Sequence, residues 1–271
     1  MKRKPNGKLV ALALAFGLVL LYPGVASAQW NSPSAYGHST GYGTVYGTYG
    51  LASTMQSMYN VARAKSQSIA AAKAEREAVP HATAKSTASS NPQIAAPPAR
   101  VVRNYGVFRP DATVDTGKAI AEALGATPEE KALIRQIYTA TKSWYEKEAA
   151  ARGWKDNIAG GLTFFTVAAM TVYHDSQEPT VEAADTHYRI LNSALDEVPD
   201  FATVSNKDKQ GFNNVMIGFG GILLAGYSEG KQEGNATTLA SNKKLAGMLI
   251  EMVLKTDPEN LRLENGQIVM K

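Results

Sequence analysis

The sequence predicts an all-α fold, a compact bundle of about six helices between residues 105 and 271. Helix-capping residues precede several segments, and in these segments apolar side chains recur at spacings of three and four residues, as on one face of a helix. Two of the segments contain a long uncharged stretch, 158–173 and 215–227, with several glycines. Because a helix that is apolar all round belongs in a core, we expect these two helices at the centre and the amphipathic helices around them.

The first two predicted helices have clear boundaries. A short helix over residues 116–124 precedes a longer one that begins at Thr127. This start combines an N-cap hydroxyl, Pro128 at the first helical position and Glu130 three residues after the cap, which is a capping box. Gly153 predicts the C-terminal end of this helix. Its apolar stripe consists of Leu133, Ile134, Ile137, Tyr138, Trp144 and Tyr145.

The third and fifth helices are the two apolar ones, over residues 157–173 and 205–227. A glycine inside a helix is less favourable than an alanine by about 1 kcal/mol, so glycines in these segments indicate that two backbones approach closely. We therefore expect the two helices to cross each other at the centre of the bundle. The expected contact points are Gly160, Gly161, Gly218, Gly220 and Gly221.

The remaining two helices are amphipathic. The fourth begins after Thr180 and ends at Pro199, and the sixth covers residues 237–255. Beyond it, residues 261–270 alternate in polarity around Asn265-Gly266, which favours a small β-hairpin with a two-residue turn.

The N-terminus has the anatomy of a secretory signal peptide. Residues 1–8 carry four basic side chains, an apolar run of 13 residues follows from Leu9 to Leu21, and Ala26-Ser27-Ala28 is a small-residue cleavage site. A membrane-spanning helix needs about 20 residues, so the run is too short for a permanent anchor. We predict cleavage after Ala28, export to the periplasm or the exterior, and no stable membrane span after cleavage.

Three segments separate the signal peptide (1–28) from the helical domain (105–271). Residues 29–52 are rich in Gly and Tyr and lack apolar periodicity, which predicts disorder. An alanine-rich stretch over 53–78 has near-helical spacing and predicts one lone helix. Residues 79–104 have the Pro, Ala and Ser content of a linker. The sequence thus predicts a disordered N-terminal arm.

Charge and cysteine content exclude several classes of function. Of 28 Lys and Arg residues, four lie in residues 1–28, which contain no acid, so the remaining chain has 24 basic and 24 acidic residues. A neutral chain lacks the field with which nucleic-acid-binding proteins attract phosphates, and we expect no nucleic-acid partner. There is no cysteine, which excludes disulfides, thiol catalysis and cysteine-ligated metals.

Few residues suggest chemistry. His174 and Asp175 end the third helix and His187 lies in the fourth, so these three are the candidates for a metal or acid–base centre. No HExxH motif accompanies them, and His174 also suits a helix C-terminus, so we predict no metal and no cofactor. Residues 226–230 match G-x-S-x-G, but the string closes a helix and no histidine follows Ser228. We assign no catalytic residue.

Several strings resemble an uncharacterised family of exported bacterial proteins, described as a domain of unknown function. They are Phe108-Arg109-Pro110, residues 127–138, residues 156–162, Lys209-Gln210 and residues 254–263. The resemblance covers about residues 105–271. It implies the domain boundaries and no particular activity.

Three functions agree with these observations. The first is an exported non-enzymatic module that binds an unknown protein or an envelope polymer, or that assembles; we favour it because catalytic signatures are missing. The second is an enzyme acting on cell-envelope polymers. The third is a membrane-active protein that uses its two apolar helices, although their apolar stretches of about 16 and 13 residues are shorter than a span requires.

Overall fold

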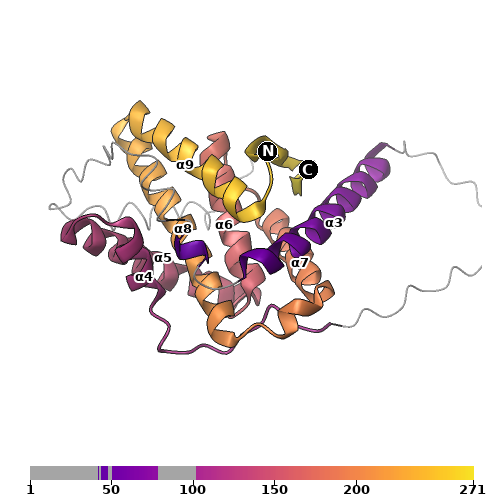
Figure 1. Cartoon of the computed structure of the whole chain (residues 1–271). Helices are drawn as coiled ribbons and strands as arrows, with labels where there is room; N and C mark the ends of the chain where they lie inside the picture. The colour runs from indigo at the N-terminus through magenta and orange to yellow at the C-terminus, as the bar shows by residue number, and fades with distance from the viewer. Residues whose placement is uncertain (1–41, 43, 48–50, 79–101) are drawn as a thin grey trace, which may run out of the picture.

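The protein is mostly helical, as the computed structural model shows for residues 42, 44–47, 51–78 and 102–271 (Figure 1). The predicted signal peptide and most of the predicted linker lie outside the described residues. The prediction of an all-α bundle with a C-terminal hairpin is confirmed. The elements are α3 (Ala52–Ala78), α4 (Thr116–Leu124), α5 (Pro128–Arg152), α6 (Ile158–His174), α7 (Val181–Glu197), α8 (Asn206–Glu233), α9 (Ala236–Leu254), the 3-10 turns η1 (Pro199–Ala202) and η2 (Pro258–Asn260), and the strands β1 (Leu261–Glu264) and β2 (Gln267–Met270).

The helix ends follow the local signals. At the start of α5, the Thr127 hydroxyl accepts from the Glu130 amide (3.2 Å) and the Glu130 carboxylate accepts from the Thr127 amide (3.3 Å), which completes the capping box. Gly153 ends α5 in the left-handed conformation, with φ of 71°. Helix α8 continues past Tyr227, where we expected its end, because the helix stops only at the left-handed Gly234 (φ 62°).

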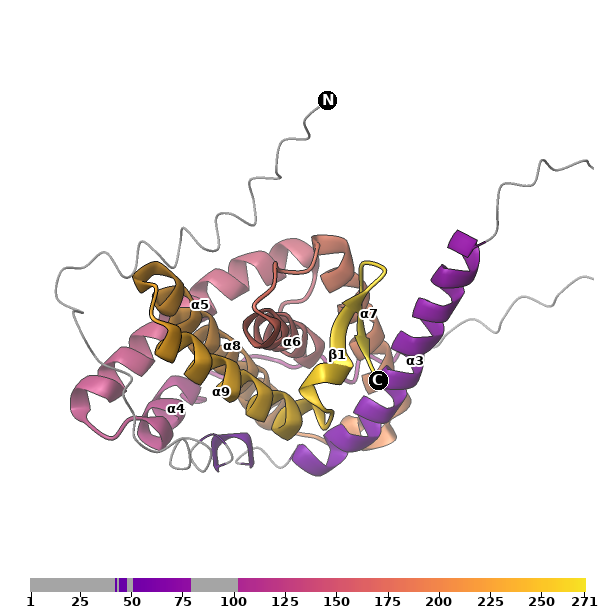
Figure 2. The same ribbon diagram turned by 90° about the horizontal axis from the view of Figure 1, so that it is seen from above.

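Helices α6 and α8 form the centre, as predicted. They share the most extensive helix contact within the described residues, and nearly all of α6 is buried. Seen from above, α6 is viewed end-on, and α5, α7, α8, α9 and the hairpin surround it (Figure 2). None of the helices in the described parts of the chain has the length and apolar character needed to cross a membrane.

The glycines of these helices contact more than one partner, which corrects the prediction. Gly161 and Gly220 do lie between α6 and α8: the Gly161 amide donates to Asn213 Oδ1 (3.1 Å), and a Cβ atom at Gly220 would lie 2.7 Å from the Phe164 ring. Gly218 and Gly221 instead face α4 and α5, and Gly160 faces α5 and Trp154. The reason is that the middle of α8 is buried all round. Gly218 and Gly221 are three residues apart and so share one face of α8, which packs on α4 and α5 instead of α6.

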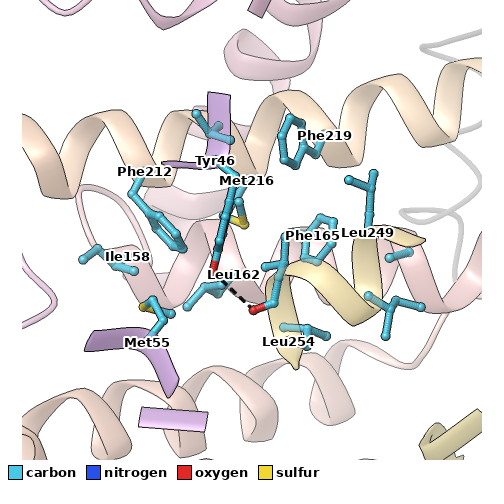
Figure 3. Close-up of a cluster of buried hydrophobic side chains, with 14 of the residues drawn as sticks. Tyr46, Met55, Ile158, Leu162, Phe165, Phe212, Met216, Phe219, Leu249 and Leu254 are labelled. Carbon is cyan, nitrogen blue, oxygen red and sulfur yellow. Dashed lines mark hydrogen bonds between the residues drawn. The ribbon is translucent and has the colours of Figure 1, made fainter. Parts of the chain in front are cut away.

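The folded body includes part of the arm, in contrast to the prediction that it begins near residue 105. Tyr42 is 1% exposed and meets the Phe219 ring edge-on, with 5.0 Å between ring centroids. Tyr46 packs on Phe212 of α8, and its hydroxyl donates to the Val253 carbonyl of α9 (3.5 Å; Figure 3). Residues 42 and 44–47 are helical, and Tyr42, Val45 and Tyr46 are buried at the i, i+3 and i+4 positions of one helix face, a pattern too short to stand out in the sequence.

The expected helix over residues 53–78 exists as α3 and packs on the body. Its first half contributes Met55, Met58 and Tyr59 to the core, and the helix runs along α7 and β2 (Figure 2). Strand β2 pairs with β1 in the register Leu261↔Met270. Asn265 and Gly266 both have positive φ, as a type I′ hairpin turn requires.

Candidate functional site

The three residues considered for a metal or acid–base centre have separate roles. Nε2 of His174 donates to the Leu261 carbonyl (2.7 Å) and so ties α6 to the hairpin. Asp175 pairs with Lys231 Nζ (2.6 Å) and accepts from the Tyr227 hydroxyl. His187 is 1% exposed, neither of its ring nitrogens has a hydrogen-bond partner among the described residues, and burial lowers its pKa to about 4. Within the described ranges, no three His, Cys, Asp or Glu side chains gather as a group that could hold a metal ion.

The G-x-S-x-G string lies inside α8 and forms no nucleophile elbow. Its central Ser228 is helical, and its hydroxyl accepts from Gln232 one turn later (3.1 Å). A nucleophile elbow requires a sharp turn between a strand and a helix. The string is therefore part of a continuous helix.

A cavity of about 320 Å³ lies among α5, α6, α7 and α8. Its aliphatic lining includes Val167 and Ala168 of α6 and Leu224 of α8. Its aromatic lining consists of Trp144, Tyr145, Trp154 and Phe164. We call this cavity the aromatic pocket. It belongs to a hydrophobic cluster centred on Tyr145, Trp154 and Phe164, which is distinct from the main core.

The end of α5 places the aromatic rings. Trp144 and Tyr145 come from the apolar stripe of α5, and both rings are tilted against Phe164, with centroid distances of 5.8 and 5.7 Å. The left-handed Gly153 then reverses the chain, and the Trp154 amide donates to the Ala149 carbonyl (2.8 Å). This turn brings Trp154 back over the last turn of the helix, beside the other rings.

Tyr188 of α7 fixes Trp154 from the other side. The two rings stack with 5.3 Å between centroids and an interplanar angle of 16°. The Tyr188 hydroxyl also donates to the Gly153 carbonyl (3.2 Å). As a result Trp154 is held in one orientation and is only 8% exposed.

The ionisable groups of the pocket are unequally paired. The Arg152 guanidinium lies 3.8 Å from the Glu148 carboxylate, 3.7 Å from that of Asp185 and 5.0 Å from the centre of the Trp154 ring system. Glu178, in the loop between α6 and α7, also lines the pocket and is partly buried. Within the described parts of the chain it makes no hydrogen bond or ion pair, and burial raises its pKa. The pocket therefore has more carboxylates than cations.

A second hollow, between α3 and α7, is larger and more open, at about 660 Å³. The ion pair of Lys65 and Glu197 (2.6 Å) crosses it, so its one carboxylate already has a cation, and the Arg189 guanidinium on its wall donates to the Thr186 hydroxyl (2.8 Å). The aromatic pocket is more enclosed and contains the unpaired carboxylate. Enclosed apolar cavities with a few polar groups are the usual form of small-ligand sites. The aromatic pocket is thus the better candidate for binding.

Sequence reasoning missed most of this site. Trp144 and Tyr145 were predicted only as core residues, and Trp154, Arg152 and Glu178 were not considered. One signal was present: two of the three tryptophans in the chain lie ten residues apart, on either side of a predicted helix end. Tryptophan is enriched at binding sites, so two tryptophans close together at a helix end are a signal of one.

A family model described as "Family of unknown function (DUF6683)" matches residues 7–271. The match agrees with the resemblance to a family of unknown function, and it extends well beyond the predicted range of 105–271, over the arm and α3. No curated protein and no solved structure matches the chain.

Proposed function

We propose that this chain, which belongs to the DUF6683 family of unknown function, is an exported bacterial, non-enzymatic module that binds a small chemical group in its aromatic pocket. The observation that carries the proposal is Glu178, a partly buried carboxylate on the wall of an aromatic cavity, which has no partner in the described part of the chain. Removing a charge from water without pairing it opposes folding. Such a group is expected where a ligand supplies the missing partner.

Export is the second part of the proposal. It is supported by the cationic start, the apolar run and the Ala26-Ser27-Ala28 site. We expect the mature protein to begin at Gln29, in the periplasm or outside the cell. Intact-mass measurement of the protein from cell fractions tests this, and recovery of the uncleaved chain from the membrane fraction would contradict it.

The raised pKa of Glu178 favours one alternative, an enzyme that acts on cell-envelope polymers. A carboxylic acid whose pKa is raised by burial can act as a general acid in glycoside hydrolysis. Glu148 also lines the pocket, but it faces Arg152 and is not free to act as the second carboxylate. If this alternative holds, purified protein releases soluble fragments from envelope polymers and Glu178→Gln abolishes the release.

The membrane-active alternative depends on the two apolar helices. These are α6 and α8, and both are buried at the centre of the bundle. Insertion into a bilayer would therefore require the bundle to open. A liposome leakage assay with the native protein tests this alternative directly.

A binding screen tests the proposed function. The purified protein is mixed with small cations, small neutral apolar compounds, anions and monosaccharides, and tryptophan fluorescence and thermal unfolding are recorded. We expect at least one class to change the fluorescence and raise the melting temperature. Trp144→Ala should remove the response, whereas Tyr173→Ala, which truncates an aromatic ring outside the pocket, should keep it. If no class binds, or if binding survives Trp144→Ala, the pocket is not the site.

A further inference from the structure

We infer that the aromatic pocket binds a small organic cation, an alkylated ammonium group, with Glu178 as its counter-ion; this rests on the proposed binding function and names the ligand class. The inference starts from charge. The positive charge of Arg152 is shared by two carboxylates, those of Glu148 and Asp185, at 3.8 and 3.7 Å. No cation of the described ranges pairs with Glu178. A positively charged ligand would supply it.

The aromatic lining favours the same ligand. The faces of Trp, Tyr and Phe rings carry negative potential and attract cations within about 6 Å, most strongly for Trp. Four rings line this pocket, and the guanidinium of Arg152 already lies 5.0 Å from the centre of Trp154. Groups of aromatic rings with a nearby carboxylate hold quaternary ammonium ions, because methyl groups gain apolar contacts while the charge meets the rings.

The polar groups of the pocket are too few for a sugar. A bound sugar needs hydrogen-bond partners for several hydroxyls, but the Thr163 hydroxyl already donates to the Ala159 carbonyl (2.8 Å). The Tyr145 hydroxyl is enclosed near Gly160 rather than free in the cavity. The remaining polar groups are the indole N–H donors of the two tryptophans, the carboxylates and Arg152, and Arg152 is engaged.

Charge argues against the other small ligands. An anion would meet the uncompensated carboxylate of Glu178, since the one cation that lines the pocket is already shared. A neutral apolar ligand would displace water from Glu178 without replacing it by a partner, which is unfavourable. The volume, about 320 Å³, lies at the lower end of the range for ligand pockets and fits a compact group.

A pair of matched ligands tests the inference. Choline and 3,3-dimethyl-1-butanol have nearly the same shape, but only choline carries a charge. Each is titrated into the purified protein at constant ionic strength, and binding is measured by calorimetry and tryptophan fluorescence. We expect choline to bind at least about 10-fold more tightly than the neutral compound, since the charge meets both Glu178 and the ring faces.

Three variants separate the contributions. Glu178→Gln should lower choline affinity about 10-fold or more and leave the affinity for the neutral compound unchanged. Trp144→Ala should lower the affinity for both ligands because it removes part of the pocket wall. Glu182→Gln is the matched control, since it removes the same charge from an exposed side chain nearby that does not line the pocket, and it should leave both affinities unchanged.

The outcomes distinguish this inference from the proposed function. If the native protein binds choline and the neutral compound equally well, the cation assignment is wrong. It is also wrong if Glu178→Gln binds choline as tightly as the native protein does. In both cases the proposed binding function of the pocket still stands. Preference for a monosaccharide or for acetate over choline would also overturn the cation assignment. If none of these ligands, and no compound of the broader screen, binds in the pocket, the proposed function itself is wrong.

Discussion

The main core and the aromatic pocket are built from similar residues but packed differently. In the core, Phe165, Phe212 and Phe219 are fully buried, and Tyr42 and Tyr46 of the arm cover α8 from outside the bundle. In the pocket, the tryptophan, tyrosine and phenylalanine rings enclose a cavity of about 320 Å³, and the Glu178 carboxylate on its wall has no partner among the residues that the structure describes.

The difference indicates what each region is for. Close packing adds van der Waals contacts and so stabilises the fold. In the core this packing includes side chains from the distant N-terminal arm. The pocket leaves both an empty volume and an uncompensated charge, and each lowers stability. Local departures from a stable design of this kind are concentrated at functional sites. Four predictions test this contrast, from the largest expected effect to the smallest.

Removing an arm tyrosine should destabilise the whole bundle. Tyr42→Ala deletes a ring that is 1% exposed and packed on Phe219, and loss of a buried aromatic side chain lowers the free energy of unfolding by about 3–5 kcal/mol. Urea unfolding followed by circular dichroism measures the loss. Val102→Ala, at a side chain that is 64% exposed, should change stability by less than about 0.5 kcal/mol. Equal stability of the two variants would mean that the arm does not belong to the core.

Acid should weaken the core through His187. Its pKa is lowered to about 4 in the folded protein, against 6.5 ordinarily, so between these values the unfolded chain binds a proton that the folded chain does not. Stability is therefore present above pH 6.5 and is lost as the pH falls toward 4, by about 3 kcal/mol. In His187→Leu this loss should be absent. Urea unfolding at several pH values measures it, and a variant with the same acid sensitivity as the native chain would refute the assignment.

Added volume should be tolerated in the pocket but not in the core. A Cβ atom at Gly221 would lie 2.8 Å from Cβ of Thr141, so Gly221→Leu should destabilise by about 1–3 kcal/mol. Gly161→Ala should also destabilise, since its Cβ would lie 2.8 Å from the Asn213 carbonyl oxygen. Val167→Leu adds one methylene at the pocket and should change stability by less than about 0.5 kcal/mol. Thermal unfolding of the three variants measures these changes. Similar losses of stability in all three would mean that the pocket is packed as closely as the core.

Neutralising Glu178 should raise stability slightly while it weakens cation binding. Burial raises the pKa of this group, so its favourable contribution to folding is present in acid and is lost as the pH rises through the folded-state pKa. Glu178→Gln should therefore unfold at a higher temperature than the native chain at pH 7, by the equivalent of less than about 1 kcal/mol because the group is partly solvated. The gain should vanish in acid. A lower melting temperature at pH 7 would indicate that the carboxylate has a structural partner.

The sequence alone determined the features that depend on neighbouring residues. The capping box at Thr127, the stop at Gly153, the Asn265-Gly266 turn and the burial of the two uncharged segments all follow from short patterns, because caps, turns and helical periodicity act within a few residues. For this reason the six helices of the bundle and the hairpin were predictable.

Tertiary structure alone decided which distant surfaces meet. Tyr42 meets Phe219, which lies far along the chain, and the glycines of α8 divide among α4, α5, α6 and α9 because of how the helices cross. The pocket combines the end of α5 with Glu178 of a later loop, whereas His174, Asp175 and His187 do not gather at one site. These long-range contacts depend on how the helices are arranged in space. That arrangement is set by the total burial of apolar surface, which no short sequence pattern determines.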